Sequence, residues 1–465
     1  MPRPNIVLIL ADDMGYGDFG ALNGGLTETP AIDQLLGEGV CLSQHYAGSP
    51  VCAPSRAALM TGRWPHRTGA IDTLEGRGLD RLRLAERTLA DYLKAAGYAT
   101  GLFGKWHLGA LDPRYHPNRR GFDEFAGFRG GWQDYYEWRL DVNGSTSRAD
   151  GRYLTDVITE ESVQFLRRHR GEPFFLHITY NAPHFPLQAP ERDLEPFLQT
   201  GRFTRGVSLI YAMIRRMDRG VARVLETLDT HGLAENTIVL FTSDNGPQFG
   251  GQGDMCTDRF NCGFNGAKGT TYEGGIRVPG LLRWPAGLDG GRTCHELAHF
   301  TDWLPTCLAA IAAIAGTGAK LVDNAPAIDG HNLLPLLRGE ARQPARRMFW
   351  QWNRYTPEII SNAALRDGPW KIVRPAIAET MALTQPDMDM DHALKYEPDG
   401  ITDIARDPVP VRILPQPPPA LLFNIDVDPG EQHDLAPAEP DRTRKMLREL
   451  EAWFEDVWTP ASRDE

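Results

Sequence analysis

A cysteine, a proline and an arginine at alternate positions mark the segment 49–63, which reads SPVCAPSRAALMTGR. Cys52 supplies a thiol, and Pro54 is suited to the first turn of a helix. Arg56 supplies a planar set of donors that matches the oxygens of sulfate or phosphate. An isolated Cys-x-Pro is typical of a buried thiol at a helix start. The longer string, in which the arginine one turn further on adds an anion-binding group, is harder to explain in this way.

The residues after Pro54 are suited to continue this helix. Ala57 to Met60 can propagate it, and Gly62 can end it. Position 52 therefore lies at a helix N-terminus, where free N–H groups and the helix dipole favour an anion. The nucleophile and the anion-binding groups would then come from one short segment.

Carboxylates follow a predicted buried strand at 5–11, which ends at Asp12 and Asp13. Two adjacent carboxylates repel each other unless a cation lies between them, although an Asp-rich turn is the simpler alternative. A second buried strand at 237–242 also ends in oxygen-bearing side chains, and open α/β sheets bind ligands beyond the carboxyl ends of their strands. The two strand ends offer an all-oxygen set typical of calcium or magnesium, namely Asp12, Asp13, Asp244 and Asn245.

Four further side chains stand in short polar segments. Any one of them alone would be an ordinary solvated or hydrogen-bonded group. Lys105 and His107 lie in GKWHLG after a strand expected at 98–103, His184 follows a strand expected at 174–180, and Lys268 lies in GAKGT.

These residues must be positioned by a large α/β unit, because strands alternate with helices as far as about residue 340. The continuous apolar strands favour a mixed, mainly parallel sheet covered by helices. The expected strands are 5–11, 40–46, 98–103, 174–180 and 237–242. The expected helices are 30–36, 88–96, 154–168, 210–228 and 304–315.

The C-terminal part follows a different pattern. Short strands at 348–352, 363–373 and 421–427 and a helix at 442–458 predict a smaller antiparallel sheet packed with a helix. The Pro- and Asp-rich stretch 375–419 is expected to be a long loop or insertion. We therefore expect a catalytic domain at 1–340 and a smaller α+β subdomain at 341–465.

The totals fit a globular enzyme of 465 residues, with 42% hydrophobic and 24% charged residues. A net charge of -12 argues against broad binding to nucleic acid or to anionic membranes, so an anionic substrate needs a local basic pocket.

The longest small-apolar run, 308–315, is too short to span a bilayer. No signal-peptide pattern precedes the first strand. We expect a cytoplasmic protein, or a periplasmic or secreted one if a leader has been removed.

Six cysteines are too few and too scattered for a disulfide framework. Cys256 and Cys262 could pair within one loop or remain free thiols.

Residues 110–150 are rich in aromatic and basic side chains. Some of these must be packing, and the others could line a pocket that recognises the substrate.

Taken together, these segments resemble the type I sulfatases of the alkaline-phosphatase-like superfamily. The resemblance rests on CAPSR with its continuation, GKWHLG, GAKGT with EGGIRVP, and the acidic strand ends. It implies a sulfate-monoester hydrolase whose Cys52 is oxidised to formylglycine by a modifying enzyme that recognises Cys52, Pro54 and Arg56. It also implies Ca²⁺ bound by Asp12, Asp13, Asp244, Asn245 and the modified Cys52.

The same resemblance implies a role for each polar side chain. The hydrate at position 52 attacks the sulfate, and Asp244 helps to deprotonate it. His184 with Lys268 protonates the leaving alcohol, and His107 is the base that releases sulfate. The substrate would be a sulfated saccharide or an aryl sulfate, with the saccharide favoured. The sulfate-contacting residues would be Arg56, Lys105, His107, His184 and Lys268.

Three other functions remain open from the sequence. A phosphonate or phosphodiester hydrolase of the same superfamily would keep the formylglycine, but such relatives tend to change the residues equivalent to Lys105, His107 and Asn245. A carbohydrate-binding protein without catalysis would result if Cys52 were never oxidised. Disulfide exchange by Cys256 and Cys262 is the least favoured, since their spacing is not Cys-x-x-Cys.

Overall fold

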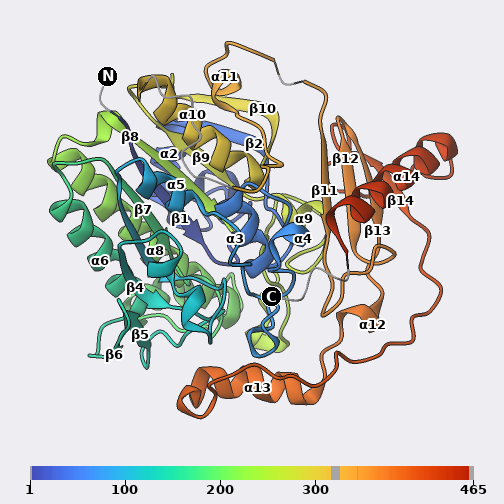
Figure 1. Cartoon of the computed structure of the whole chain (residues 1–465), viewed down its shortest axis with the longest axis horizontal. Coiled ribbons are helices and arrows are strands. Elements are labelled where there is room, and N and C mark those ends of the chain that lie inside the picture. Colours follow the sequence, from blue (N-terminus) through green and yellow to red (C-terminus); the bar gives the residue numbers. More distant parts are fainter. Residues whose placement is uncertain (1–2, 316–324, 343, 460–465) are drawn as a thin grey trace.

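The computed structural model of the chain describes residues 3–315, 325–342 and 344–459. Figure 1 shows a large unit built around a ten-stranded sheet and a smaller one built around a four-stranded sheet. The strand order in the large sheet is β10-β2-β9-β8-β1-β7-β3-β4-β5-β6. These strands are β1 (Asn5–Ala11), β2 (Val40–Tyr46), β3 (Ala99–Lys105), β4 (Glu124–Phe128), β5 (Arg139–Val142), β6 (Ser145–Arg148), β7 (Phe174–Thr179), β8 (Thr237–Ser243), β9 (Gly280–Arg283) and β10 (Arg292–His299).

The centre of this sheet is parallel and fully buried, as the apolar runs predict. Strand β1 lies between β7 and β8, and all residues of the three strands are buried. Leu10 pairs with Thr179 on one side and with Thr242 on the other. Strand β3 continues the parallel arrangement beyond β7. Antiparallel pairs occur only toward the sides, at β2·β9, β8·β9, β4·β5 and β5·β6. The carboxyl ends of β1, β3, β7 and β8 therefore meet at one edge of the sheet.

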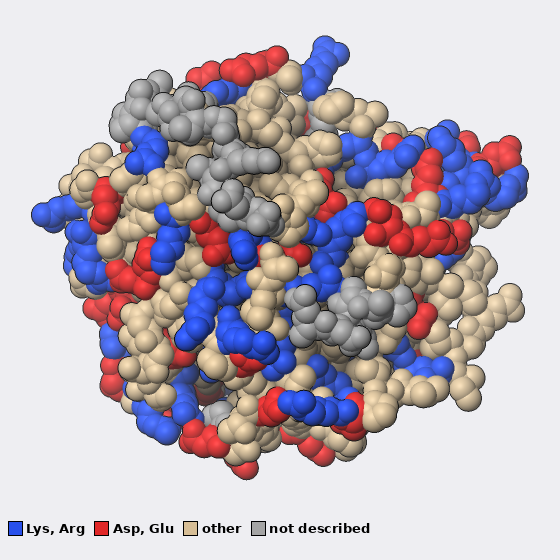
Figure 2. Space-filling model, in the orientation of Figure 1, with Lys and Arg blue, Asp and Glu red and all other residues tan. Residues whose placement is uncertain are grey.

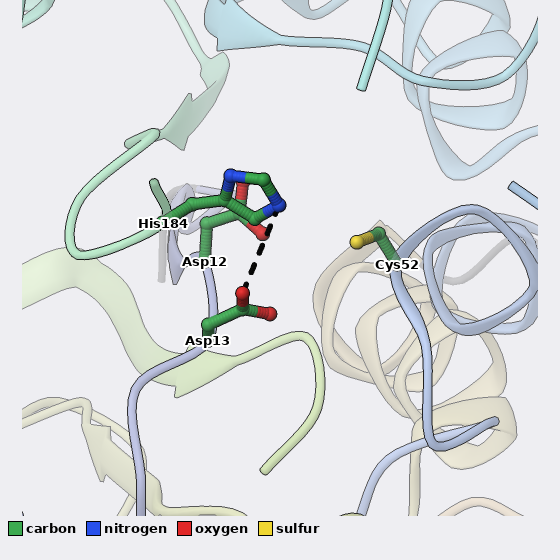
Figure 3. A group of neighbouring side chains, drawn as sticks. All are labelled: Asp12, Asp13, Cys52 and His184. Carbon is green, nitrogen blue, oxygen red and sulfur yellow. Dashed lines mark ion pairs between the residues drawn. The ribbon is translucent and has the colours of Figure 1, made fainter. Parts of the chain in front are cut away.

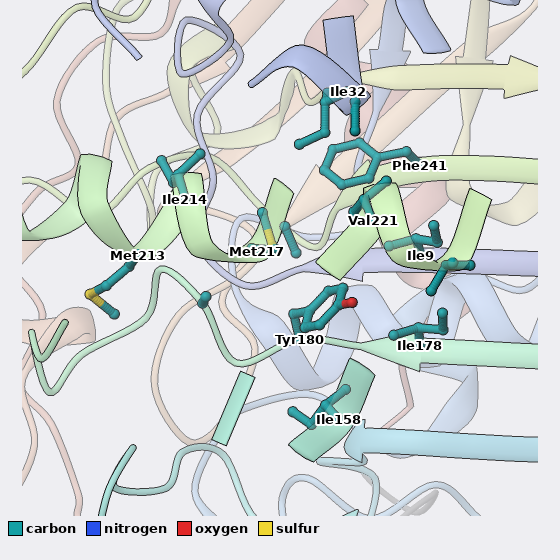
Figure 4. Close-up of a cluster of buried hydrophobic side chains, with 14 of the residues drawn as sticks. Ile9, Ile32, Ile158, Ile178, Tyr180, Met213, Ile214, Met217, Val221 and Phe241 are labelled. Carbon is teal, nitrogen blue, oxygen red and sulfur yellow. The ribbon is translucent and has the colours of Figure 1, made fainter. Parts of the chain in front are cut away.

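Helices cover both faces of the large sheet because the side chains of β1 alternate between them. Val7 and Ile9 pack in one core with helices α2, α6 and α8, and Figure 4 shows Ile9 among the side chains of this core. Leu8 and Leu10 pack in another core with α3, α5 and α10. The helices of this unit are α1 (Gly20–Asn23), α2 (Pro30–Glu38), α3 (Cys52–Thr61), α4 (Pro65–Thr68), α5 (Leu89–Ala95), α6 (Leu154–Arg168), α7 (Glu191–Gln199), α8 (Arg205–Thr230), α9 (Glu273–Ile276), α10 (Trp303–Ala315) and α11 (Leu334–Leu337).

The smaller sheet is antiparallel in the order β11-β12-β13-β14, as predicted. Helix α14 (Pro440–Val457) covers one face, and the other face packs against Tyr46 and Ile276 of the large unit. A buried ion-pair network also joins the units, because Lys371 Nζ lies 2.9 Å from both Glu273 Oε1 and Glu431 Oε1. The strands are β11 (Arg347–Gln351), β12 (Ala363–Asp367), β13 (Trp370–Arg374) and β14 (Leu421–Asn424).

The prediction of a long loop at 375–419 is wrong in part. This stretch contains two helices, α12 (Ala378–Met381) and α13 (Gln385–Tyr396). Thr384 caps α13 by accepting a hydrogen bond from the Asp387 N–H at 3.3 Å. Within α13 only Asp387 and Leu394 are buried. A helix with so narrow a buried face carries little hydrophobic periodicity, which is why its sequence resembles a loop.

Other boundaries also differ from the prediction. The helix expected at 210–228 starts earlier, at Arg205, because Thr204 caps it by accepting from the Val207 N–H at 3.1 Å. The strand expected at 363–373 is a hairpin whose turn contains Gly368 at φ 56°. The last strand ends at Asn424 instead of 427.

The surface carries no simple electrostatic pattern on the face drawn in Figure 2, where acidic and basic side chains are interspersed. Among the helices of the described residues, none combines the length and the apolar composition needed to cross a bilayer. Cys256 and Cys262 are separate free thiols, so the possible disulfide between them is not formed.

Candidate active site

Cys52 is the first residue of helix α3, as predicted, and Val51 before it is extended. The helix ends at Gly62, which has φ 67° and donates its N–H to the Ala58 carbonyl at 2.9 Å. The side chain of Cys52 is only 2% exposed. Burial raises the pKa of this thiol to about 11, against the opposing effects of Lys105 and Lys268. The unmodified thiol is therefore protonated at neutral pH and is a weak nucleophile.

The carboxylates at the strand ends are held by buried cationic side chains. Lys105 Nζ donates to Asp12 Oδ2 at 2.7 Å, and Lys268 Nζ donates to Asp13 Oδ2 at 2.8 Å. Burial alone would raise the pKa of Asp13, but Lys268 and His184 hold it below its usual range. Although burial opposes it, the contact with Asp13 raises the pKa of Lys268. Both partners of this pair are therefore charged.

Arg56 connects helix α3 to the carboxyl end of strand β8. Its Nε lies 2.9 Å and its Nη2 2.7 Å from Asp244 Oδ2, and Nη1 donates to the carbonyl of Lys105 at 3.1 Å. Asn245 donates its amide to Asp13 Oδ1 at 2.7 Å. Segments that are distant in the sequence thus converge on one cluster at the sheet edge.

Two oxygens of this cluster have no hydrogen-bond partner in the described part of the chain. Asp12 Oδ1 and Asn245 Oδ1 are both buried acceptors without a donor. Burial also raises the pKa of Asp12 to about 7, against the opposing effect of Lys105. Buried acceptors are costly unless a donor or a cation satisfies them. The donor set and its unpaired oxygens fit a hard divalent cation.

Cys52 lies beside this oxygen set. Potential ligand atoms of Asp12, Asp13, Cys52 and His184 all lie within 4.8 Å of one another, and Figure 3 shows the sulfur of Cys52 turned toward the other three side chains. Asp13 also adopts φ 66°, a left-handed conformation that is unfavourable for an aspartate and that clusters at functional sites.

The two histidines are neutral at physiological pH. Burial and Lys268 hold the pKa of His184 well below its usual range, and burial and Lys105 do the same for His107. His184 Nδ1 donates to the Phe185 carbonyl at 2.7 Å, which leaves Nε2 facing Asp13 Oδ2 at 3.7 Å. His107 has φ 55° and lines the same cavity as Cys52, His184 and Lys268. Every residue predicted for the site thus lies in or around this cluster.

The chain is similar to known proteins along most of its length. Residues 4–313 match the family model described as Sulfatase. The chain belongs to the sulfatase family. Steryl-sulfatase of Mus musculus is 32% identical over 97% of this chain and 81% of that protein. N-acetylgalactosamine-6-sulfatase of Homo sapiens is 36% identical over 75% of this chain and 72% of that protein. The crystal structure of Ps i-CgsB in complex with k-i-k-neocarrahexaose aligns with a TM-score of 0.80 at 30% identity, over 98% of this chain and 94% of that one.

The protein is accordingly a sulfuric ester hydrolase with an alkaline-phosphatase-like fold. Sulfatases generally use a formylglycine and a divalent metal, and the oxygen cluster fits the metal requirement. These relatives support sulfate-ester hydrolysis over the phosphonate-hydrolase alternative.

With its three carboxylates ionised, the sulfatase cluster is balanced in charge without a metal ion. A divalent cation would leave it with a net positive charge, which an anionic ester requires in a protein of net charge -12. The balancing groups are the carboxylates Asp12, Asp13 and Asp244 and the cations Arg56, Lys105 and Lys268.

A cavity of about 700 Å³ opens above Cys52. Trp132 lines it, as expected for part of 110–150, whereas Tyr135 and Trp138 are buried in the core. Much of the remaining wall was not predicted, because it comes from the C-terminal part of the chain. No local motif marks these residues, and their role appears only when the units are packed together. They are Trp352, Arg354, Ala376, Met381, Leu383, Met388 and Asp391.

Proposed function

We propose that this sulfatase hydrolyses the sulfate monoester of a saccharide, with a formylglycine made from Cys52 as the nucleophile and Ca²⁺ as the metal, Mg²⁺ being the alternative ion. The observation that carries the proposal is the approach of Cys52, Asp12 and Asp13 to within 4.8 Å beneath an open cavity. The cation would be held by Asp12, Asp13, Asp244 and Asn245. When bound, it would polarise the sulfate and lower the pKa of the attacking hydroxyl.

The cationic side chains bind and orient the sulfate group. Lys268 is 15% exposed and lines the cavity, so its ammonium can reach an oxygen of the ester while it stays near Asp13. Lys105 and Arg56 are fully buried and fixed by carboxylates. Such preorganised donors stabilise charge that develops in the transition state without a cost of reorganisation.

Proton transfer to the leaving alcohol needs a change at His184. Its imidazole is neutral, with a proton on Nδ1, so Nε2 must gain a proton before the ring can act as an acid from that atom. An anionic ester beside the ring raises its pKa and favours this protonation. Lys268, which is already charged, is the second donor. His107 serves as the base that releases the product.

A saccharide suits the rim of the cavity. The Trp132 ring lies 5.5 Å from that of Phe185 and 5.5 Å from that of Tyr396, which makes a row of aromatic rings. A second cavity of about 700 Å³ shares Glu75 and Trp132 with the first, so there is room for neighbouring sugar units. Aromatic rings with an apolar face are suited to stack on sugars. The names N-acetylgalactosamine-6-sulfatase and k-i-k-neocarrahexaose, given to two similar proteins or their ligands, support the same substrate class.

The modifying enzyme must act before the chain has folded. Cys52, Pro54 and Arg56 are all buried in helix α3, so the folded protein does not expose the recognised residues.

Assays of the purified, modified protein test this function. We expect release of inorganic sulfate from N-acetylgalactosamine 6-sulfate or carrageenan oligosaccharides. We expect kcat/KM for 4-methylumbelliferyl sulfate to exceed kcat/KM for 4-methylumbelliferyl phenylphosphonate, which has the same leaving group, by at least about 100-fold. Equal or faster turnover of the phosphonate would favour the alternative hydrolase, and saccharide binding without sulfate release would favour the non-catalytic protein.

A further inference from the structure

A buried carboxylate lies beside the ring of His107. Glu75 begins the 3₁₀ turn Glu75–Arg77 and is 4% exposed. Its Oε1 lies 3.8 Å from His107 Nε2. The same oxygen accepts a hydrogen bond from the Gly131 N–H and forms an ion pair with Lys395 Nζ. Neither Glu75 nor Lys395 has a part in the sulfate chemistry described above.

The surroundings of His107 select one tautomer. Its Nε2 lies 3.3 Å from the Thr73 carbonyl, and Glu75 faces the same nitrogen. Both neighbours are acceptors, so the proton of the neutral ring belongs on Nε2. Nδ1 is buried and has no partner in the described part of the chain. This arrangement leaves Nδ1 as the nitrogen that can accept a proton.

The contact between Glu75 and His107 is closely packed. A Cβ added to Gly131 would lie 2.8 Å from His107 Cε1 and 3.0 Å from Glu75 Oε1. A Cβ added to Gly130 would lie 2.6 Å from Glu75 Oε2 and 2.8 Å from Lys395 Nζ. No larger residue fits at either position without moving these groups. The absence of side chains at Gly130 and Gly131 thus lets the backbone pass close to His107, Glu75 and Lys395.

Helix α13 fixes the turn that carries Glu75. Lys395 lies in its last turn, with a side chain only 5% exposed. At the other end of the helix, Asp387 Oδ1 accepts from Arg77 Nε at 2.5 Å. The helix also lines the catalytic cavity through Met388 and Asp391. One element therefore forms part of the cavity wall and restrains the neighbour of His107.

We propose that Glu75 is a positioning residue for His107, and that Lys395 keeps the Glu75 carboxylate turned toward the imidazole. Glu75 holds the ring in the Nε2–H tautomer and in the orientation that presents Nδ1 as the base. Lys395 offsets the cost of a buried carboxylate, which would otherwise be large. The inference rests on the proposed function only in the role of His107 as base.

Kinetics of charge-removing variants test the role of Glu75. Glu75→Gln keeps the shape and the acceptor for Gly131, and we expect kcat to fall about 10- to 100-fold, as for other residues that orient a functional histidine. KM should change much less than kcat, because Glu75 is only 4% exposed and its Oε1 is already occupied by Gly131 and Lys395. Lys395 is left unpaired in this variant, so its thermal stability should also fall.

The double variant Glu75→Gln/Lys395→Met separates positioning from folding. Removing both charges should restore most of the thermal stability, while kcat stays as low as in Glu75→Gln. Recovery of wild-type kcat in the double variant, or wild-type kcat in Glu75→Gln, would overturn the proposal. Asp193→Asn is the matched control, because it removes a buried acid bound by Arg216 and Arg219 away from the cavity. It should lower stability and leave kcat unchanged.

Nitrogen-15 NMR of labelled histidine gives a readout that does not need turnover. The His107 signals, assigned by their loss in His107→Asn, should show the Nε2–H tautomer in the wild-type protein and a shifted Nε2 resonance in Glu75→Gln, in which the negative charge that faces this nitrogen is removed. An Nδ1–H tautomer in the wild-type protein would contradict the proposal. A protein with the expected spectra that releases no sulfate would refute the proposed function and leave the positioning role supported.

Discussion

Cys52→Ser is expected to lower multiple-turnover hydrolysis of a sulfate ester by at least about 1,000-fold. A formylglycine hydrate carries two hydroxyl groups on one carbon, whereas a serine carries only one. The serine hydroxyl can accept the sulfate group but has no second hydroxyl to release it. The variant should therefore stall as a stable sulfate ester at position 52, which intact-protein mass spectrometry detects.

The surroundings of Cys52 make this test specific. The side chain is buried beside Asp12 and Asp13, so a serine of nearly equal size fits without disturbing the cluster. Cys52→Ala should be inactive and should form no ester. Cys256→Ser replaces a half-buried cysteine that does not itself line the catalytic cavity, and it should keep full activity. Multiple turnover by Cys52→Ser at the wild-type rate would refute the scheme.

Removal of divalent cations should lower activity by at least about 100-fold, and Ca²⁺ should restore it. The expectation follows from the unpaired oxygens of Asp12 and Asn245 and from the charge balance of the cluster, which lacks excess positive charge without the ion. Because a ligand that binds only the folded state stabilises it, Ca²⁺ should also raise the thermal midpoint of the metal-free protein. Rates and melting curves of EGTA-treated protein, with and without added Ca²⁺, measure both effects.

The variant Asn245→Ala tests whether Ca²⁺ raises the thermal midpoint by binding at this cluster. The variant loses one oxygen ligand and one hydrogen bond to Asp13, so its melting midpoint should respond much less to Ca²⁺. Asn118→Ala serves as the control, because Asn118 binds the backbone carbonyls of Phe122 and Asp123 and does not line the catalytic cavity, and its response should match that of the wild type. Full activity in protein that elemental analysis shows to be metal-free would exclude the proposed role of the ion.

The core of the fold could be predicted because its strands are buried on both faces. Strand β1 covers the predicted 5–11, and β8 extends the predicted 237–242 by one residue. The sides of the sheet were predicted only in part, since β2 matches the expected 40–46 but the two edge strands were missed. Strand β10 alternates irregularly between buried and exposed residues, and β6 is almost wholly exposed. Edge strands of this kind take their conformation from pairing with a neighbour, which no local pattern records.

The charged centre of the site could also be predicted, since its residues stand at the ends of buried strands or in short distinctive segments. The state of Cys52 could not. A helix N-terminus favours an anion, but complete burial raises the pKa of the thiol by a larger amount. Glu75 and Lys395 were missed because they are 320 residues apart in the chain and meet only when α13 docks against the large unit.

The wall of the cavity also could not be predicted from local sequence, because it combines distant parts of the chain. Residues 341–465 were expected to form a separate subdomain, and that part of the chain supplies Trp352, Arg354 and the helix α13 to the cavity above Cys52. We therefore expect substrate selection to depend in part on residues outside the segment 4–313 that matches the family model. Comparison of that segment alone would not identify the substrate.

Mass spectrometry of the tryptic fragment that ends at Arg56 tests the central claim most directly. In protein from its natural host, or made together with a formylglycine-generating enzyme, we predict the mass loss that corresponds to replacement of the Cys52 thiol by an aldehyde. The modified fraction should match the fraction of protein that is active. An unmodified thiol in protein that nevertheless hydrolyses sulfate esters would contradict the account.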